Sequence, residues 1–79
     1  MTLAEAVSKR TQSLLISHNM TQYRLVKLTN LDKSTLQTIF KGKTKDVRLS
    51  TVSLIAHALG MELYEFFNDE MFKYENLDI

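Results

Sequence analysis

The sequence contains no cysteine, no proline and only two glycines, and each of these shortages narrows what the chain can be. Without cysteine no disulfide can stabilise the fold, and the two scattered histidines, His18 and His57, give no case for a metal site. The stability of 79 residues must therefore come from an apolar core, which a content of 44% hydrophobic residues can supply. The shortage of proline and glycine favours helices joined by short turns.

Long apolar runs are also missing. The longest run near the start, residues 14–16, is far below the ~20 residues of a membrane span and too short for the core of a signal peptide. We therefore expect a soluble, cytoplasmic protein with no membrane partner.

Catalytic patterns are absent as well. Ser, His and Asp occur at no spacing that suggests a triad, and there is neither a glycine-rich phosphate loop nor a pair of carboxylates placed for acid–base chemistry. We expect neither an enzyme nor a bound cofactor.

The net charge of +1 conceals a strong asymmetry along the chain. Residues 21–48 carry seven bases against two acids, a net charge of +5, whereas residues 49–79 carry one base against six acids, a net charge of −5. A basic middle and an acidic end indicate one surface that faces a polyanion and one that is turned away from it. Chance clustering on a solvated surface would give the same pattern.

Capping residues mark the first two helices. Thr2 and Glu5 have the spacing of a capping box, which predicts a helix over residues 3–18. Thr21 is a second N-cap candidate, for a short helix that ends near Thr29.

Three further helices follow. Asn30 tolerates the left-handed turn that must come next, Asp32 can cap a third helix, and Gly42 ends it. A fourth helix begins near Ser50 and stops at Gly60. A fifth helix completes the all-α prediction, and the residues expected to form the core are Leu3, Val7, Leu14, Leu15, Leu25, Val26, Leu28, Leu36, Ile39, Phe40, Val52, Ile55, Ala56, Leu59, Leu63, Phe66 and Phe67.

The second and third predicted helices carry the functional signal, at about Thr21–Gly42. A helix-turn-helix needs a tight turn, apolar inner faces, and small polar or basic residues on the outer face of its second helix, which enters the major groove of DNA. The outward residues of the third predicted helix are Lys33, Ser34, Gln37, Thr38 and Lys41. Such side chains can reach base edges or phosphates, and none is bulky and apolar.

Over Leu14–Phe67 the sequence resembles the phage repressor and Cro family of helix-turn-helix proteins. The stretches that carry the resemblance are Met20-Thr21-Gln22-Tyr23-Arg24-Leu25-Val26, Asn30-Leu31-Asp32-Lys33-Ser34-Thr35-Leu36, Ile39-Phe40-Lys41-Gly42-Lys43, Leu49-Ser50-Thr51-Val52, Ile55-Ala56-His57-Ala58-Leu59-Gly60, and Leu63 with Phe66 and Phe67. They occur in the family's order and spacing.

The resemblance implies a five-helix, repressor-like bundle at residues 1–67, followed by a C-terminal extension at residues 68–79. It implies a bacterial or phage transcription regulator, a repressor that binds a palindromic operator in double-stranded DNA as a homodimer. The residues expected to read base edges are Lys33, Ser34, Gln37 and Thr38. The residues expected to contact phosphates are Gln22, Lys41, Lys43, Lys45 and Arg48.

Four departures from the family pattern are visible. Asn30 stands where glycine is usual, the loop after the third helix lacks a common proline, and Glu62 replaces the Ser or Thr that caps the fifth helix, so that helix should begin less firmly. Leu15 and Phe40 occupy the positions of a charged pair that links the first and third helices in many members. We expect these two apolar side chains to touch.

The acidic, aromatic C-terminal region leaves several possibilities open. We expect the homodimer to form through Tyr64, Phe67, Met71 and Tyr74, if the fifth helix continues toward Tyr74 with the last three on one face. Alternatively, the extension folds back on its own subunit or is disordered beyond Asp69. A second functional possibility is an antitoxin-like or other protein-interaction module that binds a partner through residues 68–79. A third is a bundle that has lost DNA binding.

Overall fold

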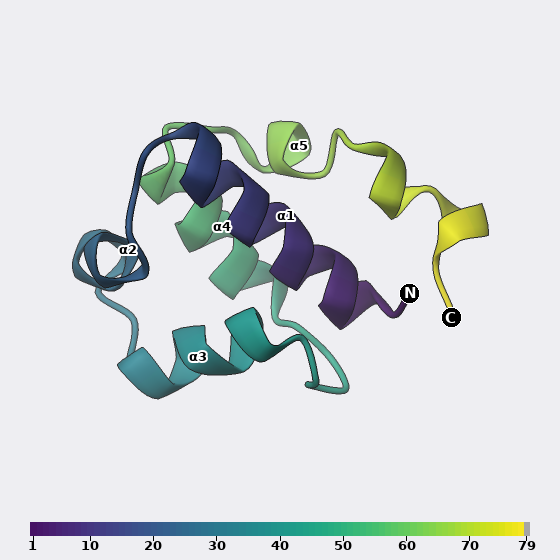
Figure 1. Ribbon diagram of the computed structural model, residues 1–79, viewed down its shortest axis with the longest axis horizontal. Coiled ribbons are helices and arrows are strands. Elements are labelled where there is room, and N and C mark those ends of the chain that lie inside the picture. The colour runs from purple at the N-terminus through teal and green to yellow at the C-terminus, as the bar shows by residue number, and fades with distance from the viewer. Residues whose placement is uncertain (79) are drawn as a thin grey trace.

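The chain is all helical over the residues that the structure, a computed structural model, describes, residues 1–78 (Figure 1). Its five α-helices are α1 (Leu3–Ser17), α2 (Gln22–Thr29), α3 (Lys33–Lys41), α4 (Leu49–Ala58) and α5 (Leu63–Phe66), followed by two 3₁₀ turns, η1 (Glu70–Phe72) and η2 (Tyr74–Asn76). The predicted five-helix fold is confirmed.

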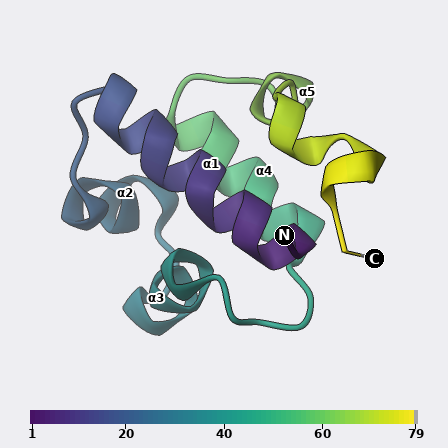
Figure 2. The same ribbon diagram turned by 45° about the vertical axis from the view of Figure 1, so that its right-hand side comes forward.

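The helices pack around α1 and α4, with α3 on one side and α5 on the other (Figures 1 and 2). α1 packs against α3, α2 against α4, and α4 against α5, while η1 returns to α1. The side chains at the centre of the core include Leu25, Leu36, Ile55 and Phe66, none of which is more than 1% exposed. The α2–turn–α3 unit is therefore held by both central helices.

The predicted helix starts are confirmed except for one cap. The Thr2 hydroxyl accepts from the Glu5 backbone (3.1 Å), and the Glu5 carboxylate accepts from the Thr2 backbone (2.8 Å). Hydrogen bonds from Thr2, led by that of its backbone, lower the pKa of the Glu5 carboxyl. Thr21 caps α2 in the expected way. Asp32 occupies the N-cap position of α3, but its side chain makes no capping hydrogen bond.

The junction between α1 and α3 is a close approach of two backbones. The Ser8 hydroxyl and the Gln12 amide both donate to the carbonyl oxygen of Phe40, at 2.7 and 3.1 Å. Gly42 ends α3 with φ +63°, and a Cβ built on it would lie 3.1 Å from the Cβ of Ser8. Because only glycine fits both the left-handed backbone and the available space, Gly42 fixes how near the end of α3 comes to α1.

The apolar replacements at Leu15 and Phe40 belong to the core. Leu15 is 5% exposed, and Phe40 is half-buried and packs against the cluster that contains Leu15. Phe40 packs against the core, and its carbonyl accepts hydrogen bonds from Ser8 and Gln12 of α1. Direct contact between the Leu15 and Phe40 side chains stays a prediction. No desolvated ion pair is needed at this position.

The prediction that two leucines belong to the core was wrong. Leu3 is 44% exposed and Leu28 is 45% exposed. Leu3 lies in the first turn of α1, where the buried stripe instead begins with Ala4 and continues through small residues such as Ser8 and Thr11. Small side chains on this stripe let α1 lie close to its neighbours, and a search for large apolar residues overlooks them.

The predicted continuation of the fifth helix toward Tyr74 was also wrong. α5 ends at Phe66, and Arg10 of α1 binds its last carbonyl groups. Arg10 Nε donates to the Phe66 carbonyl (2.7 Å), Nη2 donates to the Glu65 carbonyl (3.0 Å), and Nη1 pairs with the Asp69 carboxylate (3.4 Å). A guanidinium that satisfies these groups stops the helix and turns the chain back toward α1.

The C-terminal extension folds back on its own subunit, as the alternative interpretation proposed. Phe67 packs edge-on against Phe66 and Phe72, with ring centroids 5.4 and 5.0 Å apart. Farther along, the Met1 ammonium lies 3.2 Å from the Asp78 carboxylate. The rings of Phe67 and Phe72 are therefore partly covered within the subunit, whereas Tyr64 and Tyr74 stay exposed.

We predict that Gly42→Ala destabilises the protein more than Gly60→Ala does. Both glycines have positive φ, so both substitutions carry the left-handed backbone cost of about 1–2 kcal/mol. Only at Gly42 does the new methyl group meet a neighbour, because nothing lies within 4 Å of a Cβ at Gly60. Gly42→Ala should lower the free energy of unfolding by about 1 kcal/mol more than Gly60→Ala does, as measured by urea unfolding followed by circular dichroism. Equal losses would contradict the close approach of α3 to α1.

Candidate nucleic-acid interface

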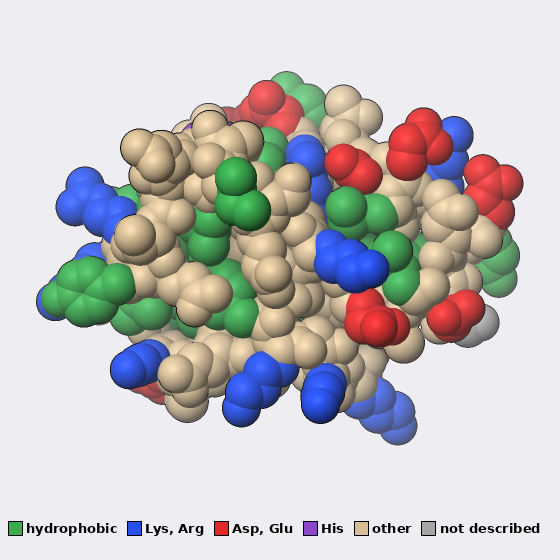
Figure 3. Space-filling model, in the orientation of Figure 1, with side chains coloured by type: hydrophobic (Ala, Val, Ile, Leu, Met, Phe, Trp, Pro, Cys, Tyr) green, Lys and Arg blue, Asp and Glu red, His purple; other side chains and the backbone are tan. Residues whose placement is uncertain are grey.

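Basic and acidic side chains lie on different parts of the surface. Lys and Arg side chains follow the edge formed by α3 and the loop after it, whereas acidic side chains gather over the C-terminal extension (Figure 3). We call the four bases at the exit of α3 the basic edge: Lys41, Lys43, Lys45 and Arg48. All four side chains are exposed, and within residues 1–78 none of them forms a salt bridge. The basic edge is therefore available to bind an anion.

The four predicted base readers lie together on the exposed face of α3. Lys33, Ser34, Gln37 and Thr38 are all exposed, within the first two turns of the helix. The Thr38 hydroxyl donates to the Ser34 carbonyl at 2.9 Å, so it is left mainly as an acceptor. The face is small and polar enough to enter a major groove.

A groove of about 520 Å³ separates α2 from α3 and borders one side of this face. Gln22, the first residue of α2, lines it together with Lys33 and Gln37 of α3. The structure thus brings the proposed phosphate contact of α2 alongside two proposed base readers. Gln37 therefore borders both this groove and the exposed face of α3.

Two further side chains on the groove were not predicted from the sequence. Tyr23 is 71% exposed, and Lys27 places its Nζ atom 5.3 Å from the centre of the Tyr23 ring. Both residues line the groove. Their spacing of four residues on α2 is the signal that could have indicated the pair.

A smaller recess of about 210 Å³ borders the other side of α3. It lies between α3, the loop after it, and the beginning of α4, and its lining residues include Thr35, Thr38, Arg48 and Thr51. Within the loop, the Thr44 hydroxyl donates to the Asp46 carbonyl at 2.7 Å. The exposed face of α3 is therefore flanked by a groove toward α2 and a recess toward α4.

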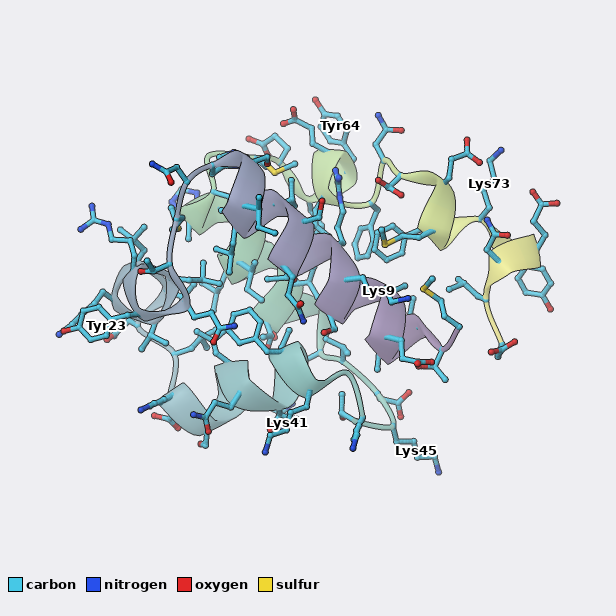
Figure 4. All side chains as sticks on the ribbon, in the orientation of Figure 1. Lys9, Tyr23, Lys41, Lys45, Tyr64 and Lys73 are labelled. Carbon is cyan, nitrogen blue, oxygen red and sulfur yellow. The ribbon has the colours of Figure 1, made fainter. Side chains whose placement is uncertain are left out.

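The basic edge and Tyr64, one of the proposed dimer residues, lie on opposite edges of the molecule (Figure 4). Lys41 and Lys45 point outward below α3, while Tyr64 lies on the far edge, over α5 (Figure 4). Tyr64 and Tyr74 are 74% and 78% exposed, whereas Phe67 is half-buried. Because α5 is short, these residues do not form one helical face.

Neither a metal-binding cluster nor a membrane-spanning helix is found within the described residues. Within residues 1–78 no three His, Asp or Glu side chains are grouped closely enough to hold a metal ion. No helix in the same range has the length and apolar character needed to cross a membrane.

Comparisons with known proteins agree with this arrangement. Residues 12–70 match the Cro/C1-type HTH DNA-binding domain. The chain is also similar to a solved structure, that of the prophage Lp1 protein 11, with a TM-score of 0.84 and 27% sequence identity over 92% of this chain and 96% of that one. No curated protein matches the chain. The family match spans α2, α3 and the basic edge, and the chain belongs to the family of Cro/C1-type helix-turn-helix DNA-binding domains, which makes it a DNA-binding regulator.

Proposed function

We propose that this regulator is a repressor that binds a palindromic operator, as a homodimer, with α3 in the major groove. The observation that carries the proposal is the unpaired basic edge, which continues directly from the exposed polar face of α3. A polar helix face supplies sequence readout, and adjacent unpaired bases supply affinity for the phosphate backbone. Such domains generally act by binding alone, and the proposal includes no catalysis and a cytoplasmic location.

In this proposal Lys33, Ser34, Gln37 and Thr38 contact base edges. Lys33 is the strongest candidate because its ammonium can donate to the acceptors of guanine, and it lies where α3 begins. Gln37 can both donate and accept, and it reaches the groove beside Gln22. These contacts decide which sequence is bound.

Phosphate contacts come from two sides of α3. Gln22 stands at the start of α2, where free backbone N–H groups favour an anion. On the other side of α3, the basic edge can contact the phosphates of the second DNA strand that borders the major groove. Two anchored sides fix the angle at which α3 enters the groove.

The dimer is proposed through Tyr64 and Tyr74, with smaller parts for Phe67 and Met71. Tyr64 and Tyr74 are the most exposed aromatic side chains away from α2, and aromatic residues are enriched at protein interfaces. Because Tyr64 lies on the edge opposite Lys41 and Lys45, a contact at Tyr64 would leave the basic edge uncovered (Figure 4). We propose that residues 1–67 hold the DNA-binding unit and residues 68–79 brace it.

An antitoxin-like module that binds a partner protein through residues 68–79 has less support. Phe72, which such a module would present to its partner, packs against Phe66 and Phe67. The extension also pairs Asp69 with Arg10. A partner would have to displace contacts that the extension already makes with its own subunit.

We predict that Lys33→Ala and Lys43→Ala impair DNA binding in different ways. Selection from random DNA with the wild-type protein should return a palindromic consensus. Lys33→Ala should relax the sequence preference at one or two base positions. It should weaken the binding free energy by about 1–3 kcal/mol on the best site only. Lys43→Ala should weaken binding to all sequences alike and reduce the slope of log affinity against log salt by about 1 for each lost phosphate contact. Binding titrations at several salt concentrations measure both effects.

The exposed Lys9 of α1 provides the matched control, because it carries the same charge but belongs neither to α3 nor to the basic edge. Lys9→Ala should leave the consensus unchanged and the salt slope nearly so. A salt slope near zero for the wild-type protein would exclude the phosphate contacts. Equal losses for Lys33→Ala on selected and random DNA would show that Lys33 does not read bases.

We predict that Tyr64→Ala weakens self-association about tenfold or more, as expected when an aromatic anchor is lost from an interface. Folding should not change, because the side chain is 74% exposed. Tyr23→Ala is the matched control, since Tyr23 is 71% exposed but lies on α2. Sedimentation of the DNA-free proteins measures the association. Equal association of all three proteins would move the interface elsewhere, and a wild-type protein that binds selected DNA as a single subunit would exclude the dimer.

A further inference from the structure

The groove between α2 and α3 combines an apolar floor with a polar rim. The lining residues that are buried or partly buried are all apolar, and they form the floor: Val26, Leu31, Leu36 and Phe40. The exposed lining residues all carry a polar group, and they form the rim: Gln22, Tyr23, Lys27, Asn30, Lys33 and Gln37. Hydrophobic side chains are visible on the surface between the two helices (Figure 3). An apolar floor with a few polar groups around it is the pattern of a small-molecule site.

The charges on the rim are all of one sign. Lys27 and Lys33 line the groove, and no Asp or Glu side chain does. Neither lysine forms a salt bridge within residues 1–78. The Lys27 ammonium lies over the Tyr23 ring, which engages only one side of it and leaves N–H donors for an acceptor. The rim therefore complements an anion.

Two aromatic rings face the groove from its opposite walls. Phe40 of α3 belongs to the floor, and Tyr23 of α2 belongs to the rim. Phe40 stands where many relatives have a charged residue, so the floor at this end of α3 is apolar through a departure from the family pattern. Aromatic rings in contact stabilise one another beyond the area that they bury. The two walls therefore favour a ligand that itself carries a ring.

The groove is large enough for a small ligand, and the C-terminal extension does not cover it. Its volume of about 520 Å³ falls within the range of roughly 300–1,000 Å³ that small-molecule sites occupy. The extension lies at the far end of the molecule from α2 (Figure 1). The space is therefore open to a molecule from solution.

We propose that this groove binds a small aromatic carboxylate, with the ring on the floor and the carboxylate at Lys27 and Lys33. Such a site goes beyond the proposed function, because it makes the protein responsive to a small acid. Gln22, Lys33 and Gln37 border the groove and are also the proposed DNA contacts. The acid and the operator therefore compete, a consequence that rests on the proposed function. Because such coupling is reciprocal, the operator must weaken binding of the acid by the same factor.

The first test uses the DNA-free protein and probes that separate ring from charge. Phenylacetate and cinnamate carry a ring and a carboxylate, phenylacetamide carries the ring without the charge, and acetate carries the charge without the ring. Each is titrated into ¹⁵N-labelled protein while the amide resonances are followed. Both aromatic acids should shift residues 22–40 saturably, and phenylacetate should bind about tenfold more tightly than phenylacetamide, since its hydrogen bonds to lysine are charge-assisted. Acetate should give no saturable shift over the same concentrations.

Three variants assign the contacts. Lys27→Gln removes a charge from the rim at an exposed position outside the proposed DNA contacts, so the fold should be retained. It should weaken phenylacetate binding about three- to tenfold, as expected for one charge-assisted hydrogen bond, and leave phenylacetamide unchanged. Lys9→Gln, the matched control, removes the same charge from α1 and should change neither. Val26→Thr keeps a branched side chain but makes the floor polar, and it should weaken both ring-bearing probes alike.

Three results of these titrations would overturn the site. They are the absence of saturable shifts in residues 22–40 with both aromatic acids, equal affinity for phenylacetate and phenylacetamide, and equal effects of Lys27→Gln and Lys9→Gln. Shifts of residues 22–40 that follow protein concentration alone would also overturn it, because a second copy would then occupy the groove.

A competition experiment separates this proposal from the proposed function. Saturating phenylacetate should lower the affinity of the wild-type protein for its selected operator, and Lys27→Gln should need more phenylacetate for the same effect. If the protein selects no DNA sequence but the aromatic acids shift residues 22–40, the proposed function fails and the site stands. If the protein binds its operator and neither acid shifts these residues, the site fails and the function stands.

Discussion

The contact between the end of α3 and the first half of α1 is the constraint on which the DNA-binding face depends. Gly42 permits the two backbones to approach, and Ser8 and Gln12 hold the Phe40 carbonyl. α3 has only nine residues, so a small rotation at this contact would move every outward side chain on it. The same contact sets the width of the recess toward α4, because the loop after Gly42 forms one of its walls. A packing constraint at the end of α3, outside its base-reading face, thus determines the geometry of the site.

Electrostatic pairing distinguishes the two ends of the molecule. In the C-terminal extension the acids Asp69, Glu70 and Asp78 are paired with Arg10, Lys73 and the Met1 ammonium. The basic edge has no such partners within the described chain, so its charge is directed at solvent and at any polyanion that approaches. The net charge of +1 is therefore a poor indicator of polyanion binding, whereas the distribution of charge over the surface is a good one. The Arg10–Asp69 pair also attaches the acidic extension to α1.

The local features of the fold could be predicted from the sequence, and the long-range ones could not. Thr2, Thr21 and Gly42 act through neighbours within a few residues, so their spacing was enough to predict the helix ends. Arg10 binds carbonyl groups more than 50 residues away, and no local pattern indicates that a helix will be stopped in this way. The exposed face of α3 followed from helical periodicity. The recess did not, since it exists only where α3, a loop and α4 meet.

We propose that α3, the basic edge and the beginning of α4 face DNA while α5 and the extension do not. Amide chemical-shift mapping of the ¹⁵N-labelled protein with its selected operator tests this claim most directly. We expect the amide resonances of Gln22 and of residues 33–51 to shift, and those of residues 70–78 to stay unchanged apart from effects of dimerisation. Shifts confined to α5 and the extension, with residues 33–51 unchanged, would contradict it.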